Sequence, residues 1–293
     1  MADQSGIICI GSVLWDVIGR ASGCMSLGSD EPGKIKRSPG GVTLNVARKL
    51  HGFGMQPTIL SAIGTDRDGD ELLGEIMRMG LDCHHVYRSD DLPTDSYIAI
   101  EADNGLIAAV ASTHSLEACG DKVLQPLTSG ALSTTDTPIT LDGNLHPKIL
   151  QTLSTAPLLK SSDLRIVAAS PSKARRLNAF TTHSSATLYL NLEEAGLLCE
   201  TEFPDSTTAA VALIERGAYR VLVTDGENAV SEVIGTSIIT QMPPAVSVSQ
   251  VTGAGDTLVA AHIASEVQGK SREAALNSSL KAVAAHVSGR VQS

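Results

Sequence analysis

The residues best placed to do chemistry lie near the end of the chain, in the stretch VTGAGDTLVAAHIA that begins at Val251. Gly253 and Gly255 flank an alanine, Asp256 follows at once, and small apolar residues then continue at helical spacing. Glycines at a helix N-terminus let an anion approach the backbone amides, and the helix dipole favours negative charge there. A carboxylate in that place could take a proton from a hydroxyl that attacks a phosphoryl group held by the amides.

Two other phosphate-binding motifs do not fit this stretch. It is not a P-loop, because no Gly-Lys-Ser/Thr follows the glycines, and it is not a dinucleotide fingerprint, because Leu258 occupies the third glycine position. On these residues alone, a tight turn followed by an N-terminal aspartate is the alternative interpretation.

A second chemically capable group is the run Cys83-His84-His85. Consecutive side chains diverge on a helix or a strand, so these three are not expected to share one metal ion. The five cysteines are scattered, odd in number and without a CxxC pair. This pattern favours reduced thiols in a cytoplasmic protein over a disulfide framework.

Composition limits the classes of protein that the chain can belong to. With 293 residues it can bury a large core, as one big domain or as one domain with a small appendage. A formal net charge of −10 argues against a general nucleic-acid or membrane-surface binder. No basic stretch before an apolar run opens the sequence, so no signal peptide is expected, and no run approaches the roughly 18 apolar residues that span a bilayer.

Apolar runs alternate with helical patterns along the chain. Residues 6–13 (GIICIGSV) are predicted as a buried strand, and residues 42–54 (VTLNVARKLHGFG) as a helix that ends at Gly54. Later, LRIVAAS precedes PSKARRLNAF, TLYLNL precedes EEAGLL, and STTAAVALIERG precedes RVLVTDG. Repeated strand and helix units predict a mostly parallel sheet with helices on both faces.

Two segments break this alternation. Residues 17–39 are rich in glycine and serine, and residues 96–112 (SYIAIEADNGLIAAVAS) predict a hairpin around an Asp-Asn-Gly turn. We interpret both as a small β-sheet that stands off the main domain as a lid over a site. The alternative is a surface hairpin without a role in function.

Several motifs, taken together and in this order, resemble those of the ribokinase-like (PfkB) family of sugar and nucleoside kinases. SPGGVTLNVARKLHGFG and IGTDRDGDELLGEIMRMGL resemble its first signature, and VTGAGDTLVAAHIA its second. Between them, NLEEAGLL matches an Asn-x-x-Glu motif, VLVTDGENAV matches a nucleotide-side turn, and ITLDGNL is similar to a segment after a central strand. The resemblance covers residues 1–293 and implies a single α/β kinase domain. The implied fold is a ribokinase-like αβα sandwich with a central, mostly parallel sheet and a small β-sheet lid.

The resemblance implies a role for each matching residue. Asp256 matches the catalytic base, and the amides of Gly253, Ala254, Gly255 and Asp256 match an anion hole. The residues that match binders of acceptor hydroxyls are Asp16, Gly41 and Asn45. The motif that holds Mg²⁺ is matched by Asn191 and Glu194. ATP-binding positions are matched by Thr224, Gly226, Thr252, Gly253 and Gly255.

These roles imply an ATP- and Mg²⁺-dependent phosphotransferase. Asp256 would deprotonate a primary hydroxyl, which attacks the γ-phosphorus in line while lid closure excludes water. Two positions depart from the family pattern. Gln250 stands where many relatives carry an aspartate of a monovalent-cation site, so potassium activation is not expected. VAASPSKA replaces the usual Asp/Glu-Pro-Val-Ser before the position of Lys173, which leaves the role of that loop open.

The lid stretch and VTGAGDTL look most like pseudouridine kinases within the family, which phosphorylate the 5′-hydroxyl of a C-nucleoside. The alternatives are a ribokinase- or fructokinase-type sugar kinase or another nucleoside kinase, and the 3% aromatic content disfavours a large purine. A remoter alternative is a non-catalytic sugar-binding regulator. The small-molecule acceptor is the expected partner, without nucleic acid or membrane, and exposed lid strands predict a homodimer through the lid.

Overall fold

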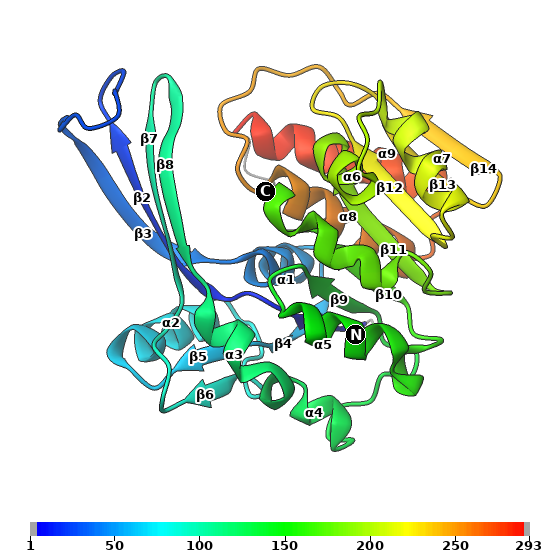
Figure 1. Cartoon of the computed structure of the whole chain (residues 1–293), viewed down its shortest axis with the longest axis horizontal. Helices are drawn as coiled ribbons and strands as arrows, with labels where there is room; N and C mark the ends of the chain where they lie inside the picture. Colours follow the sequence, from blue (N-terminus) through cyan, green and yellow to red (C-terminus); the bar gives the residue numbers. More distant parts are fainter. Residues whose placement is uncertain (1–4, 290–293) are drawn as a thin grey trace.

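Most strands belong to one large sheet in the computed structural model, which describes residues 5–289 (Figure 1). In sheet order these strands are β14 (Ser237–Gln241), β13 (Val230–Ile234), β12 (Arg220–Thr224), β11 (Ala186–Asn191), β10 (Leu164–Val167), β9 (Ile139–Asp142), β1 (Gly6–Ile10) and β4 (Gln56–Leu60). Every pairing from β12 to β4 is parallel, whereas β13 and β14 pair antiparallel at one edge. The predicted mostly parallel sheet is confirmed.

Helices cover both faces of this sheet. One face carries α1 (Val42–Gly52), α2 (Arg67–Arg78), α8 (Ala254–Val267) and α9 (Arg272–Val287). The other carries α3 (His114–Val123), α4 (Gln125–Thr128), α5 (Pro147–Thr155), α6 (Leu192–Cys199), α7 (Ser206–Glu215) and the 3₁₀ segments η1 (Pro157–Leu159) and η2 (Pro171–Phe180). Strand β1 joins the two cores, because Ile7 and Cys9 pack on one face while Ile8 and Ile10 pack on the other.

Segment η2 corrects one expectation from the sequence. Residues 171–180 (PSKARRLNAF) were expected to form an α-helix and instead form a 3₁₀ helix. Its buried side chains, Ala174, Leu177 and Phe180, recur every third residue. Three residues per turn is the 3₁₀ period, so this winding brings all three onto the core side.

A second, smaller sheet stands apart from the large one (Figure 1). Its strands, in order, are β3 (Gly33–Gly40), β2 (Leu14–Ala21), β7 (Ser96–Ala102) and β8 (Gly105–Ser112), and we call them the small sheet. The predicted hairpin is β7 and β8, and β2 begins three residues before the predicted segment. A two-stranded parallel pair, β5 (Ala62–Gly64) and β6 (Tyr87–Ser89), lies beside the end of β4. No helix in the described range is long and apolar enough to cross a membrane.

Candidate active site

Three polar residues lie at the carboxyl edge of the large sheet, and two of them, Asn191 and Thr224, are predicted site residues. Asp142, Asn191 and Thr224 are the last residues of β9, β11 and β12. Thr224 lies directly opposite Asn191 in the parallel register. The predicted metal-binding and ATP-binding motifs therefore begin side by side, at the edge where ligands of open α/β sheets bind.

The glycine stretch forms the start of helix α8, as predicted. Gly253 is its N-cap residue and has a φ of 80°, a left-handed conformation that glycine adopts without strain. The Ala254 N–H donates to the Val251 carbonyl at 3.0 Å, so this amide is not available for an anion. The amides of Gly253, Gly255 and Asp256 have no acceptor among the described residues. Three of the four predicted amides are thus free at the helix N-terminus.

Asp256 lies in the first turn of α8 and is half-buried. Burial and, to a smaller extent, the nearby Asp142 carboxylate raise the pKa of its carboxyl to about 6. A hydrogen bond from the Asn45 side chain and the charges of Lys49 and Arg48 oppose this rise in pKa. Helix α1 therefore supplies the polar surroundings of Asp256, and a carboxyl with this pKa is ionised at neutral pH yet basic enough to accept a proton.

Asp16 approaches from the small sheet. It stands on β2 opposite Ser38 of β3 and Tyr97 of β7. A Cβ at Gly40 would lie 2.0 Å from its Oδ2, so only glycine fits beside the carboxylate. Burial raises the pKa of Asp16 to about 6, and the charge of Arg48 opposes that rise. Because Arg48 acts on both Asp16 and Asp256, α1 connects the two carboxylates.

Gly41 and Asn45 lie on either side of the start of α1. Gly41 is the N-cap residue with a φ of 95°, and a Cβ there would meet the Ser12 carbonyl at 2.5 Å. The structure thus explains Gly41 by backbone shape, and it brings Asn45, predicted as an acceptor ligand, against Asp256.

The Asn-x-x-Glu motif forms a capping box at the start of α6. Asn191 Oδ1 accepts from the Glu194 amide at 2.8 Å, and Glu194 Oε2 accepts from the Asn191 amide at 2.9 Å. Asn191 Nδ2 and Glu194 Oε1 have no hydrogen-bond partner among the described residues. Burial raises the pKa of Glu194, which a cation would counteract. A carboxylate oxygen that the fold orients and leaves unpartnered fits a hydrated Mg²⁺, which takes few protein ligands.

The remaining ATP-side residues are more exposed. Gly226 lies in an exposed turn closed by a 2.8 Å hydrogen bond from the Asn228 amide to the Asp225 carbonyl. Thr252 is exposed, and its carbonyl accepts from the ring of His286 at 2.8 Å.

Sequence reasoning missed a buried network beneath these residues. Asp142 accepts hydrogen bonds from the Ser12 amide at 2.8 Å, the Ser12 hydroxyl at 2.9 Å and the Thr43 hydroxyl at 2.9 Å. Asn144 donates to the Ser12 hydroxyl at 2.9 Å and accepts from the Lys173 ammonium. The network ties the end of β9 to the loop after β1 and to α1. In the sequence, the Asp-Gly-Asn of ITLDGNL is the segment that could have indicated this network.

Arg48 and Lys49 were also missed. They follow Asn45 by three and four residues, so a helix places all three on one side. That spacing could have identified them as cations of the site.

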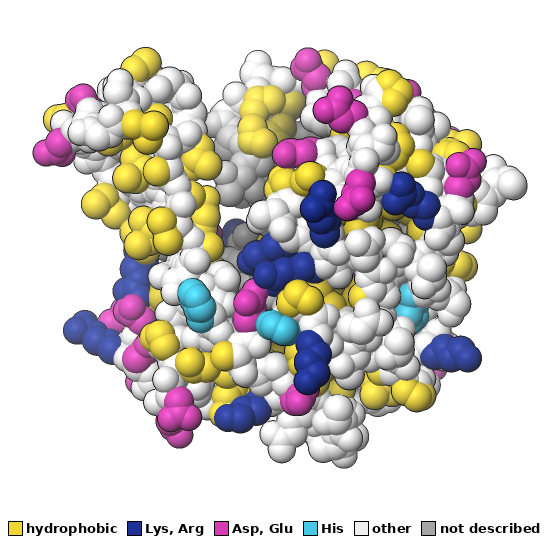
Figure 2. Space-filling view, viewed as in Figure 1, with side chains coloured by type: hydrophobic (Ala, Val, Ile, Leu, Met, Phe, Trp, Pro, Cys, Tyr) yellow, Lys and Arg dark blue, Asp and Glu magenta, His cyan; other side chains and the backbone are white. Residues whose placement is uncertain are grey.

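Figure 2 shows the molecule hollowed between the small sheet and the main domain, with basic and acidic side chains at the bottom of the hollow. This is the side on which the small sheet faces the large one in Figure 1.

Another cluster in the described chain has the composition of a metal site, namely Glu232, His262 and Glu266. Both carboxylates are already ion-paired, since Arg220 contacts each of them at 2.5 Å and Arg165 contacts Glu266 at 2.6 Å. Guanidinium groups at this distance oppose a metal ion. We interpret the cluster as an ion network that ties the end of α8 to β10, β12 and β13.

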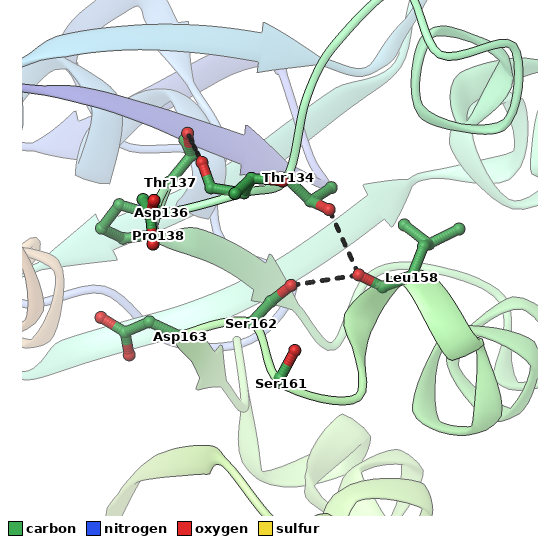
Figure 3. Close-up of a pocket in the computed structure, with 9 residues that line it drawn as sticks. Thr134, Asp136, Thr137, Pro138, Leu158, Ser161, Ser162 and Asp163 are labelled. Carbon is green, nitrogen blue, oxygen red and sulfur yellow. Dashed lines mark hydrogen bonds between the residues drawn. The ribbon is translucent and has the colours of Figure 1, made fainter.

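A pocket at the opposite edge of the sheet does not contribute to the site. It is lined by residues 134–138 before β9, by Ser161, Ser162 and Asp163 before β10, and by Leu158. Figure 3 shows the Thr134 and Ser162 hydroxyls directed at the Leu158 carbonyl, to which each donates at 3.2 Å. These hydroxyls are satisfied internally, and the pocket lies at the amino ends of the strands.

Comparison with known proteins agrees with this geometry. The family described as pfkB family carbohydrate kinase matches residues 4–290. A protein of Escherichia coli (strain K12) described as the uncharacterized sugar kinase YeiI is 28% identical over 277 residues, which cover 92% of this chain and 75% of that protein. The pseudouridine kinase of the same organism is 31% identical over 105 residues, which cover 36% of this chain and 34% of that protein. A carbohydrate kinase from Agrobacterium tumefaciens superposes with a TM-score of 0.80 at 26% identity, covering 96% of this chain and 90% of the other. The chain therefore belongs to the pfkB family of carbohydrate kinases and is an ATP-dependent phosphotransferase with the ribokinase-like fold.

Proposed function

We propose that this kinase phosphorylates the 5′-hydroxyl of a nucleoside, with Asp256 as the base. The observation that carries the proposal is that Arg48 of α1 acts on two carboxylates from different parts of the fold. Asp256 stands beside three free amides at the start of α8, and Asp16 reaches the same region from the small sheet. One carboxylate can hold an acceptor hydroxyl while the other deprotonates the hydroxyl that reacts.

In this proposal the amides of Gly253, Gly255 and Asp256 stabilise the negative charge of the transferring phosphoryl group. Asn191 and Glu194 hold Mg²⁺, which when bound neutralises charge on the ATP phosphates. Thr224, Gly226 and Thr252 contact ATP, and Asn45 keeps the Asp256 carboxylate oriented. The small sheet acts as the lid that excludes water from the reacting groups.

We further propose pseudouridine as the acceptor. Tyr97 lies opposite Asp16 in register, so an aromatic ring accompanies the carboxylate that would grip the ribose diol. A ring at that place suits a flat pyrimidine base, which can stack on it. The partial similarity to pseudouridine kinases supports the same choice.

A sugar kinase of the ribokinase or fructokinase type is the second candidate. The similarity to the E. coli protein described as a sugar kinase favours it, because that similarity extends over 92% of this chain. A free sugar would use the Asp16 carboxylate without needing Tyr97.

The experiment that separates these acceptors is steady-state kinetics across pseudouridine, uridine, their 2′-deoxy counterparts, ribose and fructose. Loss of the 2′-hydroxyl leaves the Asp16 carboxylate without a partner, which costs about 1–3 kcal/mol. At about 1.4 kcal/mol per tenfold, we expect a loss of about 5- to 150-fold in kcat/KM for the deoxy compounds.

Two variants sharpen this test. Asp16→Ala should remove the preference for ribosides over deoxyribosides, whereas Asp103→Ala, at the exposed hairpin tip of the same sheet, should keep it. If ribose or fructose exceeds every nucleoside, the nucleoside proposal is wrong and the sugar-kinase candidate replaces it.

We also propose a cytoplasmic homodimer joined through the small sheet. The face opposite Asp16 presents Ile35, Ile98 and Val110, which are 80%, 50% and 69% exposed. These side chains carry no charge, so a second copy can cover them with the same surface. The five cysteines are unpaired and suit a reducing compartment. Light scattering at micromolar concentration tests the dimer, which Ile98→Lys should dissociate.

A further inference from the structure

One side chain of helix α9 contacts the glycine stretch at the start of α8. His286, in the last turn of α9, lies with Nε2 2.8 Å from the Thr252 carbonyl oxygen and Nδ1 3.4 Å from the Lys49 ammonium. A Cβ added at Gly253 would lie 3.3 Å from the same Nε2. The imidazole therefore sits between helix α1 and the residues that form the free amides.

The partners of His286 determine the role of each ring nitrogen. A carbonyl oxygen can only accept, so Nε2 carries the proton and donates it to Thr252. An ammonium can only donate, so Nδ1 presents its lone pair to Lys49. The two ring nitrogens therefore have different partners, one on the glycine stretch and one on α1.

The contact to Thr252 fixes the orientation of the next amide. In a trans peptide the C=O and the following N–H point in opposite directions because the unit is planar. Holding the Thr252 carbonyl toward His286 therefore directs the Gly253 N–H away from His286. Gly253 has a left-handed backbone and no side chain, so an outside contact to the Thr252 carbonyl further limits rotation of this peptide.

The backbone on both sides of His286 strengthens this connection. The Gln250 side chain donates to the His286 carbonyl at 3.1 Å, and the Ser249 amide donates to the Val287 carbonyl at 2.7 Å. The segment before Gly253 is thus attached to the end of α9 by its backbone as well as by the ring. On the other side, the positive charge of Lys49 acts on Asp256 and favours its ionised form.

We propose that His286 is a positioning residue of the kinase: it orients the Gly253 amide toward the transferring phosphoryl group and holds Lys49 beside Asp256. This inference rests on the proposed roles of Asp256 and of the free amides. It assigns to α9, which contributes none of the proposed catalytic groups, the task of setting the geometry of those groups. Any ATP-dependent reaction at this site would need that geometry, whatever the acceptor.

The test compares His286→Leu with His286→Gln. Leucine fills similar space without either polar contact, whereas glutamine carries an amide donor for Thr252 and a carbonyl acceptor for Lys49. Removing one donor to a developing oxyanion lowers kcat by roughly 10²–10³-fold, and misorienting it should cost less. We expect His286→Leu to lower kcat by about 10- to 100-fold with the acceptor KM within about twofold, and His286→Gln to recover most of kcat.

Lys49→Met in combination with His286→Leu tests whether the two residues act together. If they do, the double variant loses less activity than the product of the single losses. Lys281→Leu, an exposed position on α9, is the matched control and should behave as wild type. Melting temperatures of all variants show whether each remains folded.

The outcomes separate this inference from the proposed function. If Asp256→Asn abolishes activity while His286→Leu is as active as wild type, the role of His286 is refuted and the base assignment stands. If Asp256→Asn stays active, the proposed function fails first. Equal losses in His286→Leu and His286→Gln, or a loss confined to KM, would refute the positioning role.

Discussion

Replacing Asp256 by asparagine should inactivate the enzyme and stabilise the fold at the same time. The loss of a positioned general base lowers kcat by roughly 10²–10⁴-fold. The gain in stability follows from burial, which raises the pKa of this carboxyl from 3.8 to about 6. The ionised carboxylate is therefore less stable in the folded protein than in the unfolded chain. A neutral asparagine removes that cost in folding free energy.

The size of the gain can be worked from the pKa. A rise of about two pH units at about 1.4 kcal/mol each sets an upper limit of about 3 kcal/mol. Asp256 is half-buried, and a carboxylate in the first turn of a helix also benefits from the helix dipole, so we expect a net gain of about 1–2 kcal/mol. For a chain of this size that raises the melting temperature by about 2–3 °C.

The pH dependence of the difference in stability between Asp256→Asn and wild type also tests the sign of this effect. Below about pH 4 the carboxyl is protonated in both states, so the variant and wild type should melt alike. Between about pH 4 and pH 6 the unfolded chain ionises first, and the advantage of asparagine grows to its full value above pH 6.

Calorimetry at pH 5 and pH 8, with activity measured on the same samples, is the assay. Asp205→Asn is the control, because hydrogen bonds from Thr208 lower the pKa of that helix-capping carboxyl and its loss should not stabilise the protein at pH 8. A melting temperature for Asp256→Asn below that of wild type at pH 8, or activity within threefold of wild type, would refute the reasoning.

Three further predictions follow from the same site. The pKa values of about 6 for Asp16 and Asp256 predict that kcat/KM falls as pH drops through 6, because both carboxylates become protonated. Below pH 5 a plot of log(kcat/KM) against pH should have a slope near two, and Asp16→Asn should reduce that slope toward one. Glu194→Gln should keep the capping box with Asn191, and so the melting temperature, while a magnesium titration shows a roughly tenfold higher requirement; an unchanged requirement would make Glu194 purely structural. Asp142→Asn should destabilise the protein by about 2–4 kcal/mol in urea unfolding. Three donors face Oδ2 and the Asn144 amide donates to Oδ1, so an asparagine side chain would place its own N–H group against one of these donors, and a loss below about 1 kcal/mol would contradict the network.

The sequence predicted those parts of the fold that depend on local pattern. The alternation of apolar strands with helices was readable because each unit carries its own periodicity, and the Asp-Asn-Gly turn marked the hairpin of β7 and β8. The α-helix expected over residues 171–180 was wrong, because its period of three in buried residues was not distinguished from a helical one. The small pair of β5 and β6 was not foreseen, because three-residue strands carry almost no pattern.

The site was predictable where a motif is continuous in sequence. The glycine stretch with Asp256, and the capping box of Asn191 and Glu194, each lie within a few residues. The contact between Lys49 and His286 joins residues 237 positions apart, and no local pattern announces it. Ala254 was assigned a free amide because a sequence motif does not specify which N–H turns back to the preceding carbonyl.

The construction of the small sheet bears on how such an enzyme can diverge. Its strands come from two separate segments of the chain, β2 with β3 and β7 with β8. Strands β3, β7 and β8 contribute no residue to either hydrophobic core. Helix α8, by contrast, is packed into the core along its length and is anchored at its far end by Glu266 to Arg165 and Arg220. Substitutions around Asp16 and Tyr97 should therefore have little effect on the stability of the core that holds Asp256 in place. Under the proposed function, a lineage could exchange one acceptor for another by altering exposed strands while the phosphoryl-transfer half stays unchanged.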